Sequence, residues 1–242
     1  MISAYYAQRF DIIAGYTSTW ITNHILMNDF PDEVKPIFES LQDDLVWLHG
    51  RWKLYRQLYG VSELRIELLN ETASSFFHQL QNTLLDDVTL SIARMTEKKE
   101  VAGRENLVLA QLIEKLDKSE FSGLRSRLGE QLDEIEKVCE PLRKNRHRLI
   151  AHRDLEAAIS DSEDLPGISR AMIEDALEEI RTFMNTVQGY FADSETGYEH
   201  FAMKDDVESL VVSLKKAVDY DDAVDEGLIS RERLRKSRYW DA

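Results

Sequence analysis

Cysteine is almost absent from this chain of 242 residues, in which Cys139 stands alone. One cysteine can form neither an intramolecular disulfide nor a multi-cysteine metal site, so we expect Cys139 to fill the core of a cytoplasmic protein. No stretch approaches the roughly 18 uninterrupted apolar residues that indicate a membrane-spanning helix, and residues 1–20 lack the pattern of a secretion signal. These absences predict a cytoplasmic protein without a membrane span.

Proline and glycine are also scarce, with four and ten residues respectively, which argues against a strand-rich sandwich with frequent turns. The residues that favour helices, namely leucine, glutamate, alanine, lysine and arginine, are abundant instead. With 43% hydrophobic residues, the chain has enough apolar material for a substantial core. The composition therefore predicts an all-α protein, organised as one globular domain with appendages.

Apolar residues recur at helical spacing along most of the chain and divide it into successive amphipathic helices. Breaks at Pro31, Gly60 and Gly103 separate the first of them. Ser62 is a candidate helix cap, and Pro141 can kink or interrupt the helix that contains it. The expected helices cover roughly residues 3–27, 38–59, 62–96, 106–116, 121–151, 169–191 and 204–218.

The helices that meet near Gly60 are expected to form an antiparallel hairpin, and residues 33–192 to close a bundle of four to five main helices. Residues 1–32 add an N-terminal helix, and residues 193–242 a C-terminal helical appendage with a basic tail. Residues 97–105 are expected to form a polar loop. The expected core residues of the helix before that loop are Leu69, Ala73, Phe76, Phe77, Leu80, Leu84, Val88, Ile92 and Met95.

Metal and nucleotide sites have no clear signature in this sequence. Acidic doublets can converge on two metal ions, but they are more typical of solvated helix faces and caps. Four histidines show no metal-ligand spacing, and a glycine-rich phosphate loop is absent. We therefore predict no metal and no cofactor. The doublets are Asp43-Asp44, Asp86-Asp87, Asp205-Asp206 and Asp221-Asp222, and the histidines are His24, His49, His78 and His200.

Positive charge is concentrated in one short segment of an acidic chain. The formal net charge is -15, yet residues 143–153, the basic segment, contain five basic side chains, two histidines and no acid. Such a segment keeps a positive local potential and predicts contact with an anionic partner. Its polar members are Arg143, Lys144, Asn145, Arg146, His147, Arg148, His152 and Arg153.

Helical phase separates two kinds of residue in the basic segment. Projected at about 100° per residue, Arg146 falls on the apolar stripe of its helix, whereas Lys144 and Arg148 project to the far side. Arg146 therefore points to where the bundle packs or a partner helix docks, and the residues that flank it are Asn145, His147 and His152. The same geometry is compatible with a structural role, in which Arg146 snorkels or pairs with a buried carboxylate and His152 caps the helix end.

The arrangement from Arg146 to His152 resembles the signature of the HEPN superfamily, an arginine, a polar residue and, after four to six intervening positions in all, a histidine. Five residues separate Arg146 from His152, and the polar residue is His147. Residues 150–154, 47–59 and 82–94 are most similar to the abortive-infection U-type branch, and the resemblance covers residues 35–190. It implies a HEPN-like antiparallel helical bundle.

The resemblance also implies a homodimer whose two motifs face one cleft, and a metal-independent endoribonuclease of bacterial defence, either an abortive-infection protein or a toxin held by an antitoxin protein. RNA supplies its own 2′-hydroxyl nucleophile, so the protein needs a base, an acid and a cation for the transition state that leads to a cyclic phosphate. His152 is the candidate base or acid, Arg146 the phosphate clamp and His147 an auxiliary acid. The further RNA-binding candidates are Arg143, Lys144, Asn145, Arg148 and Arg153.

On one straight helix Arg146 and His152 lie about 120° apart, which favours a site shared between two protomers. Two other functions stay open: a HEPN-like module that binds RNA or protein without cleavage, and a structural protein in which the basic segment only caps a helix and pairs with acidic surface. The basic run at residues 231–238, with Tyr239 and Trp240, is either a grip for single-stranded RNA or, more simply, a solvated tail.

Overall fold

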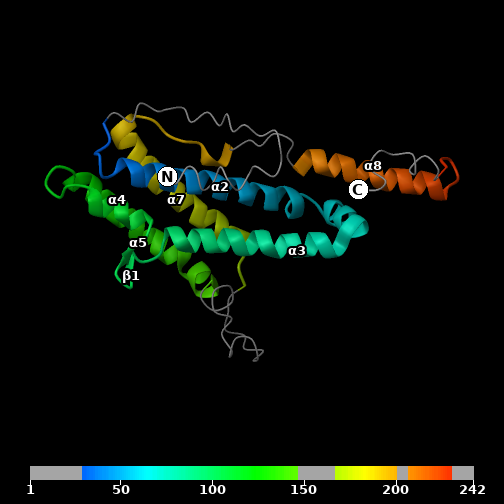
Figure 1. The fold of residues 1–242 in the computed structure, drawn as a ribbon, viewed down its shortest axis with the longest axis horizontal. Helices are drawn as coiled ribbons and strands as arrows, with labels where there is room; N and C mark the ends of the chain where they lie inside the picture. Colours follow the sequence, from blue (N-terminus) through cyan, green and yellow to red (C-terminus); the bar gives the residue numbers. More distant parts are fainter. Residues whose placement is uncertain (1–28, 147–166, 201–206, 231–242) are drawn as a thin grey trace, which may run out of the picture. The chain divides into compact units, whose positions relative to one another are not determined.

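The described part of the chain is almost entirely helical. The computed structural model describes residues 29–146, 167–200 and 207–230. The all-α prediction is confirmed, whereas the helix expected over residues 3–27 lies outside these ranges. The elements are α2 (Lys35–Tyr59), α3 (Glu63–Met95), β1 (Glu100–Val101), β2 (Arg104–Glu105), α4 (Leu109–Lys115), α5 (Ser122–Asn145), α7 (Arg170–Ala192), the 3-10 turn η2 (Tyr198–His200) and α8 (Val207–Asp225) (Figure 1).

The chain divides into two compact units, and the long helices α2 and α3 contribute to both. The first unit comprises residues 1–49 and 88–200, and the second comprises residues 50–87 and 201–242. No helix in the described ranges is long and apolar enough to cross a membrane. The expected division into residues 1–32, 33–192 and 193–242 stays a prediction.

The pair α5 and α7 forms the centre of the first unit, and α4 also packs against α5. Each of the two helices buries one stripe of apolar side chains at spacings of three and four residues, as the sequence predicts. The first part of α2 buries a third stripe in the same unit. The fully buried members of the three stripes include Leu128, Ile135, Cys139 and Leu142 on α5, Ile173, Leu177, Ile180 and Met184 on α7, and Phe38, Leu41, Leu45 and Leu48 on α2.

The ends of these helices follow from their sequence. Ser169 caps α7, because its hydroxyl accepts a hydrogen bond from the Met172 backbone N–H at 3.2 Å. The helix ends where Asp193 takes a left-handed conformation with φ of 44°. The helix α5 continues through Pro141 to Asn145, so Pro141 does not interrupt it.

The second unit has its own small core, built by the adjoining ends of α2 and α3 together with α8. Its buried members are Leu58, Leu69, Phe77, Val207 and Val211. A hydrogen bond of 2.8 Å from the Tyr59 hydroxyl to the Phe77 carbonyl oxygen, and a forked ion pair between Arg65 and Glu208 at 2.7 and 3.0 Å, reinforce it. The predicted cap at Ser62 is confirmed by a 3.2 Å bond from the Arg65 N–H.

The prediction of an uninterrupted helix over residues 62–96 was wrong at Ala73. This residue has extended backbone angles, φ -161° and ψ 66°, which kink α3. On a straight helix Phe76 would follow Leu69 on the same face, but after the kink Phe77 is buried and Phe76 is 62% exposed. Ala73 is exposed as well, so the prediction that Ala73 and Phe76 belong to the core was wrong.

The polar loop expected over residues 97–105 contains a small hairpin. The strands β1 and β2 pair antiparallel, with Val101 opposite Arg104. Ala102 and Gly103 form the turn, and both have positive φ, 52° and 76°, as tight hairpins require. Two-residue strands carry no alternation that a sequence pattern can detect.

Two helix ends also differ from expectation, since α4 is confined to Leu109–Lys115 and α8 continues to Asp225.

The α7 stripe yields a test of the fold. Replacing Ile180, which is fully buried, by alanine should lower the free energy of unfolding by about 2–5 kcal/mol, because it leaves a cavity in the core. The control Glu178→Ala removes an exposed side chain of the same helix and should change stability by less than about 0.5 kcal/mol. Urea denaturation measures both, and equal effects would contradict the described packing.

Candidate functional site

The last turn of α5 and the segment that follows α3 come together in the first unit. Arg143 joins them, because its Nη1 donates to the Thr96 carbonyl oxygen at 3.0 Å while its Nη2 donates to the Glu136 carbonyl oxygen at 2.8 Å. Both acceptors are backbone carbonyls and lie near the end of α3 or on α5 itself. Arg143 therefore fastens the start of the basic segment to the bundle.

Arg146 lies at the C-cap of α5 and keeps helical backbone angles. Its backbone N–H bonds to the carbonyl oxygens of Leu142 and Arg143, so the residue continues the phase of the buried stripe below it. Its side chain is 25% exposed, which agrees with the predicted position on the apolar stripe rather than on the solvated face.

Among the described residues, the Arg146 guanidinium makes one ion pair. Its Nη1 donates to Glu97 Oε1 at 2.8 Å, and the Glu97 side chain is 29% exposed. Its Nε is buried and has no hydrogen-bond partner among the described residues.

Other members of the basic segment occupy different surroundings. Lys144 is 63% exposed and pairs with Glu140 at 2.7 Å, one turn earlier on α5, where that contact lowers the pKa of the Glu140 carboxyl. Asn145 is half-buried. The structure thus separates Arg146 from Lys144 as helical phase predicts. His147, Arg148, His152 and Arg153 lie outside the described residues.

The segment that carries Glu97 is braced by hydrogen bonds to its backbone. Asn106 donates from its backbone N–H to the Lys99 carbonyl oxygen and from its side-chain amide to the Lys98 carbonyl oxygen, both at 2.8 Å. The Gln111 amide also donates to the Lys99 carbonyl oxygen, at 3.1 Å. Together with the bond from Arg143 to Thr96, these contacts hold the backbone on both sides of Glu97.

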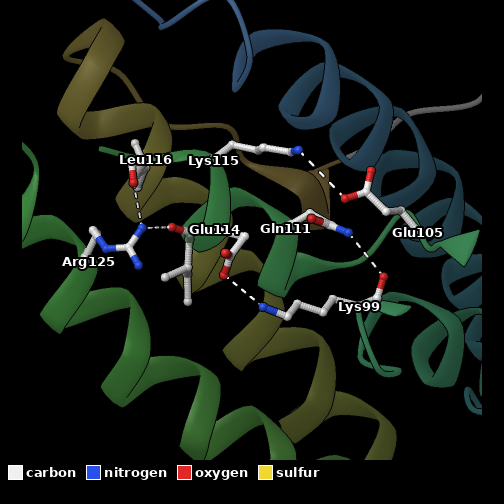
Figure 2. A network of polar contacts seen from close by, with 8 residues as sticks. Lys99, Glu105, Gln111, Glu114, Lys115, Leu116 and Arg125 are labelled. Carbon is white, nitrogen blue, oxygen red and sulfur yellow. Dashed lines mark hydrogen bonds and ion pairs between the residues drawn. The ribbon is translucent and has the colours of Figure 1, made fainter. Parts of the chain in front are cut away.

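Side-chain contacts extend this bracing to α4 and the start of α5 (Figure 2). Lys99 pairs with Glu114 at 2.8 Å, and Lys115 lies 3.8 Å from Glu105 of β2. Arg125 of α5 donates to the Leu116 carbonyl oxygen at 2.6 Å and to the Ile113 carbonyl oxygen. Figure 2 shows these side chains linking the hairpin segment, α4 and α5. Glu97 therefore belongs to a supported segment rather than to a free loop.

Comparison with protein families identifies the scaffold. The family model described as AbiU2, a HEPN family, matches residues 31–219. The chain belongs to the AbiU2 family of HEPN proteins. The match confirms the resemblance to the abortive-infection U-type branch of the HEPN superfamily and extends through α7 into α8. None of the curated proteins and none of the solved structures compared with the chain gives a match.

The AbiU2 bundle also contains a groove that is separate from Arg146. It has a volume of about 750 Å³, lies along α5 and α7, and is lined by Phe121, Arg127, Arg181, Asn185 and Tyr190 among others. Glu120, Glu195 and Glu199 line it as well. These carboxylates offset the positive charge of Arg127 and Arg181. Arg127 also lies on the order of 28 Å from Arg146 along α5, at 1.5 Å per residue. Volume alone therefore does not indicate the functional site.

Metal ligation finds no support in the described part of the AbiU2 chain. No group of three or more histidine, cysteine, aspartate or glutamate side chains within residues 29–146, 167–200 and 207–230 converges on a position that suits a metal ion. The doublets Asp43-Asp44 and Asp86-Asp87 lie on α2 and α3. Burial, and for Asp43 the neighbouring acids Asp44 and Glu39, raises the pKa of the Asp43 and Asp86 carboxyls.

A second polar cluster lies inside the first unit, where sequence reasoning did not expect one. The His49 ring stacks on the Tyr198 ring at 5.8 Å between centroids, and both residues are buried. Nearby, Thr196 donates to the fully buried Gln188 side chain at 2.8 Å, and Gln42 donates to Thr196 at 3.2 Å. This cluster joins α2, α7 and the segment before η2.

His49 is held in its neutral form. Burial, assisted by the Arg181 cation and opposed by the Glu199 carboxylate, lowers the pKa of His49 from 6.5 to about 4. Its Nε2 has no hydrogen-bond partner among the described residues. A lone histidine on an apolar helix face gives no sequence signal that distinguishes it from a core residue, and we assign His49 to the fold rather than to chemistry.

The buried His49 gives the folded protein a defined acid sensitivity. Between pH 6.5 and about 4 the unfolded chain binds a proton at His49 that the folded chain does not, so the free energy of unfolding falls as the pH is lowered through this window. The loss attributable to His49 is at most on the order of 3 kcal/mol.

The variant His49→Leu should therefore show a weaker loss of stability on acidification, measured by urea denaturation at several pH values. His78→Gln is the matched control, because His78 lies exposed on α3 and bonds only Asn82 among the described residues. If the stability of His49→Leu falls with pH as steeply as that of the wild type, then His49 is not the source of this acid sensitivity.

Proposed function

We propose that this AbiU2 protein is a metal-independent endoribonuclease of bacterial defence, in which Arg146 clamps a phosphate of the RNA substrate. The observation that carries the proposal is the Arg146 guanidinium, which the phase of α5 directs onto the apolar stripe and which remains 25% exposed. A guanidinium keeps its charge at every relevant pH and binds phosphate oxygens in a bidentate manner.

The reaction requires little besides correct placement. A base removes the proton of the ribose 2′-hydroxyl, whose oxygen attacks the adjacent phosphorus. The bond from phosphorus to the 5′-oxygen then breaks, and an acid returns a proton to that oxygen. The products are a 2′,3′-cyclic phosphate and a 5′-hydroxyl. We assign one of the two proton transfers to His152, as base or acid, and the other to His147. Arg146 stabilises the charged phosphorane.

The remaining members of the basic segment supply long-range attraction for RNA. Lys144 is exposed on α5, where it pairs with Glu140 at 2.7 Å, and an ion pair on a solvated helix face of this kind is easily exchanged for contact with a phosphate. Arg148, Arg153 and Asn145 are assigned to the same role. Arg143 contributes its charge, while its terminal nitrogens fasten α5 to the segment after α3.

A homodimer completes the proposed site. On a straight helix the side chains of Arg146 and His152 would diverge by about 120°, so two protomers related by a twofold axis can present the arginine of one and the histidine of the other to one phosphate. An antitoxin protein is the proposed inhibitor of the assembled site. A solution mass of twice 28.1 kDa is expected.

The cleavage assay uses the purified full chain with single-stranded RNA in EDTA. We expect cleavage between about pH 5 and 9, where histidine changes its charge, with cyclic-phosphate ends visible by mass spectrometry. Arg146→Ala and His152→Ala should each slow cleavage by about 100-fold or more, because each removes a group that acts in the transition state.

The matched control is Lys137→Ala, which removes one positive charge from an exposed position of α5, where Lys137 pairs with Glu134. It should retain wild-type cleavage. Lys144→Ala should weaken RNA binding with a smaller effect on the rate than Arg146→Ala. The proposal fails if the wild-type protein does not cleave RNA in EDTA, or if Arg146→Ala folds normally and cleaves at the wild-type rate.

One observation favours a second candidate, a HEPN module that binds without cleaving. Glu97 already accepts a hydrogen bond from Arg146, so one donor of the guanidinium is occupied without any ligand. If this pair were only structural, Arg146→Ala would lower the melting temperature and leave both RNA cleavage and the effect on cell growth unchanged. The assay above, combined with thermal melting of the same variants, separates the two candidates.

A further inference from the structure

We infer that Glu97 is a positioning residue for Arg146, an inference that rests on the endoribonuclease proposed above. Its carboxylate accepts one hydrogen bond from Arg146 Nη1 at 2.8 Å and so sets the orientation of the guanidinium. Only one of the five N–H donors of an arginine is used in this contact. The group remains able to bind a phosphate while its direction is fixed.

The location of Glu97 supports this role. It is the second residue after the end of α3 at Met95. Its neighbours on the chain, Thr96 and Lys98, both accept hydrogen bonds at their backbone carbonyls, from Arg143 at 3.0 Å and from Asn106 at 2.8 Å. A carboxylate on a braced backbone can direct its partner, whereas one on a free loop would only follow it.

The exposed fractions argue in the same direction. With 25% of Arg146 and 29% of Glu97 accessible, the pair lies neither in the core nor free in water. The pair matters for geometry, because an unrestrained arginine samples many rotamers and a displacement of about 1 Å from a reacting phosphate can slow a reaction by as much as about 100-fold.

The charge of Glu97 and its hydrogen bond to Arg146 have opposite effects on RNA, so variants that change one without the other can separate them. The negative charge of Glu97 opposes the approach of a polyanion, while its hydrogen bond favours the correct placement of Arg146. Removing the side chain should therefore reduce the rate of the chemical step without weakening RNA binding. Glu97→Gln keeps an oxygen acceptor at the same position and removes the charge, so it should retain the rate and bind RNA more tightly.

The closing experiment compares the full-length wild type with Glu97→Ala, Glu97→Gln and Glu140→Ala. Glu140→Ala removes the same charge close to the basic segment, where Glu140 contacts Lys144. Single-turnover cleavage of a single-stranded RNA gives the rate and the apparent affinity. We expect a rate loss of about 10-fold or more in Glu97→Ala, a rate close to wild type in the other two variants, and no loss of affinity in any of them.

A second measurement is independent of cleavage. Phenylglyoxal modifies accessible guanidinium groups, and mass spectrometry of the peptide that contains Arg146 gives its reactivity. Reactivity should rise several-fold in Glu97→Ala and stay near the wild-type value in Glu97→Gln and Glu140→Ala. Failure of the wild type to cleave RNA would refute the proposed endoribonuclease, whereas the Arg146 reactivity would still decide whether Glu97 holds the guanidinium.

Three results would overturn the positioning role. If Glu97→Ala cleaves at the wild-type rate and binds RNA more tightly, then Glu97 only competes with the substrate for Arg146. If Arg146 is equally reactive in the wild type and in Glu97→Ala, then the ion pair does not restrain the guanidinium. Loss of the rate in Glu97→Ala without recovery in Glu97→Gln would show that the charge, rather than the hydrogen bond, is required, and would also contradict the inference.

Discussion

The packing of α5 against α7 is the constraint on which the candidate site depends. A buried stripe that runs from Leu128 to Leu142 fixes the rotation of α5 about its axis, and with it the direction in which every later residue of the helix projects. Arg146 follows the stripe and Lys144 leaves it. A change in the packing of the core would therefore redirect the guanidinium, although Arg146 itself lies outside the core.

Helical periodicity and end signals account for the part of the fold that the sequence predicts well. The Ser169 cap and the spacing of apolar residues define α7, and Gly60 with Ser62 defines the junction between α2 and α3. The kink at Ala73 has no comparable signal, because its backbone angles are open to any residue and depend on how the second unit packs. Short hairpins are not predicted for a related reason, since strands of two residues are too short to show an alternating sequence pattern.

The candidate site could be predicted only where its residues are close together in the sequence. Arg146 and its neighbours in the sequence are candidates because their spacing and helical phase single them out. Glu97 reaches Arg146 across 49 positions of the chain, and an acid in a polar segment resembles any solvated acid. His49 was equally hidden, because its contact with Tyr198 spans most of the chain. Contacts between residues that are far apart in the sequence can be recognised only in the folded structure.

The buried thiol of Cys139 has a practical consequence. Burial raises its pKa to about 11, so very little thiolate forms at neutral pH and the side chain is protected from modifying reagents. Because the sequence contains no other cysteine, a cysteine introduced on the surface becomes the one reactive thiol of the molecule. Spin labels or fluorophores can thus be placed on α5 or α8 without first removing a native residue, and distances measured between such labels test the proposed homodimer.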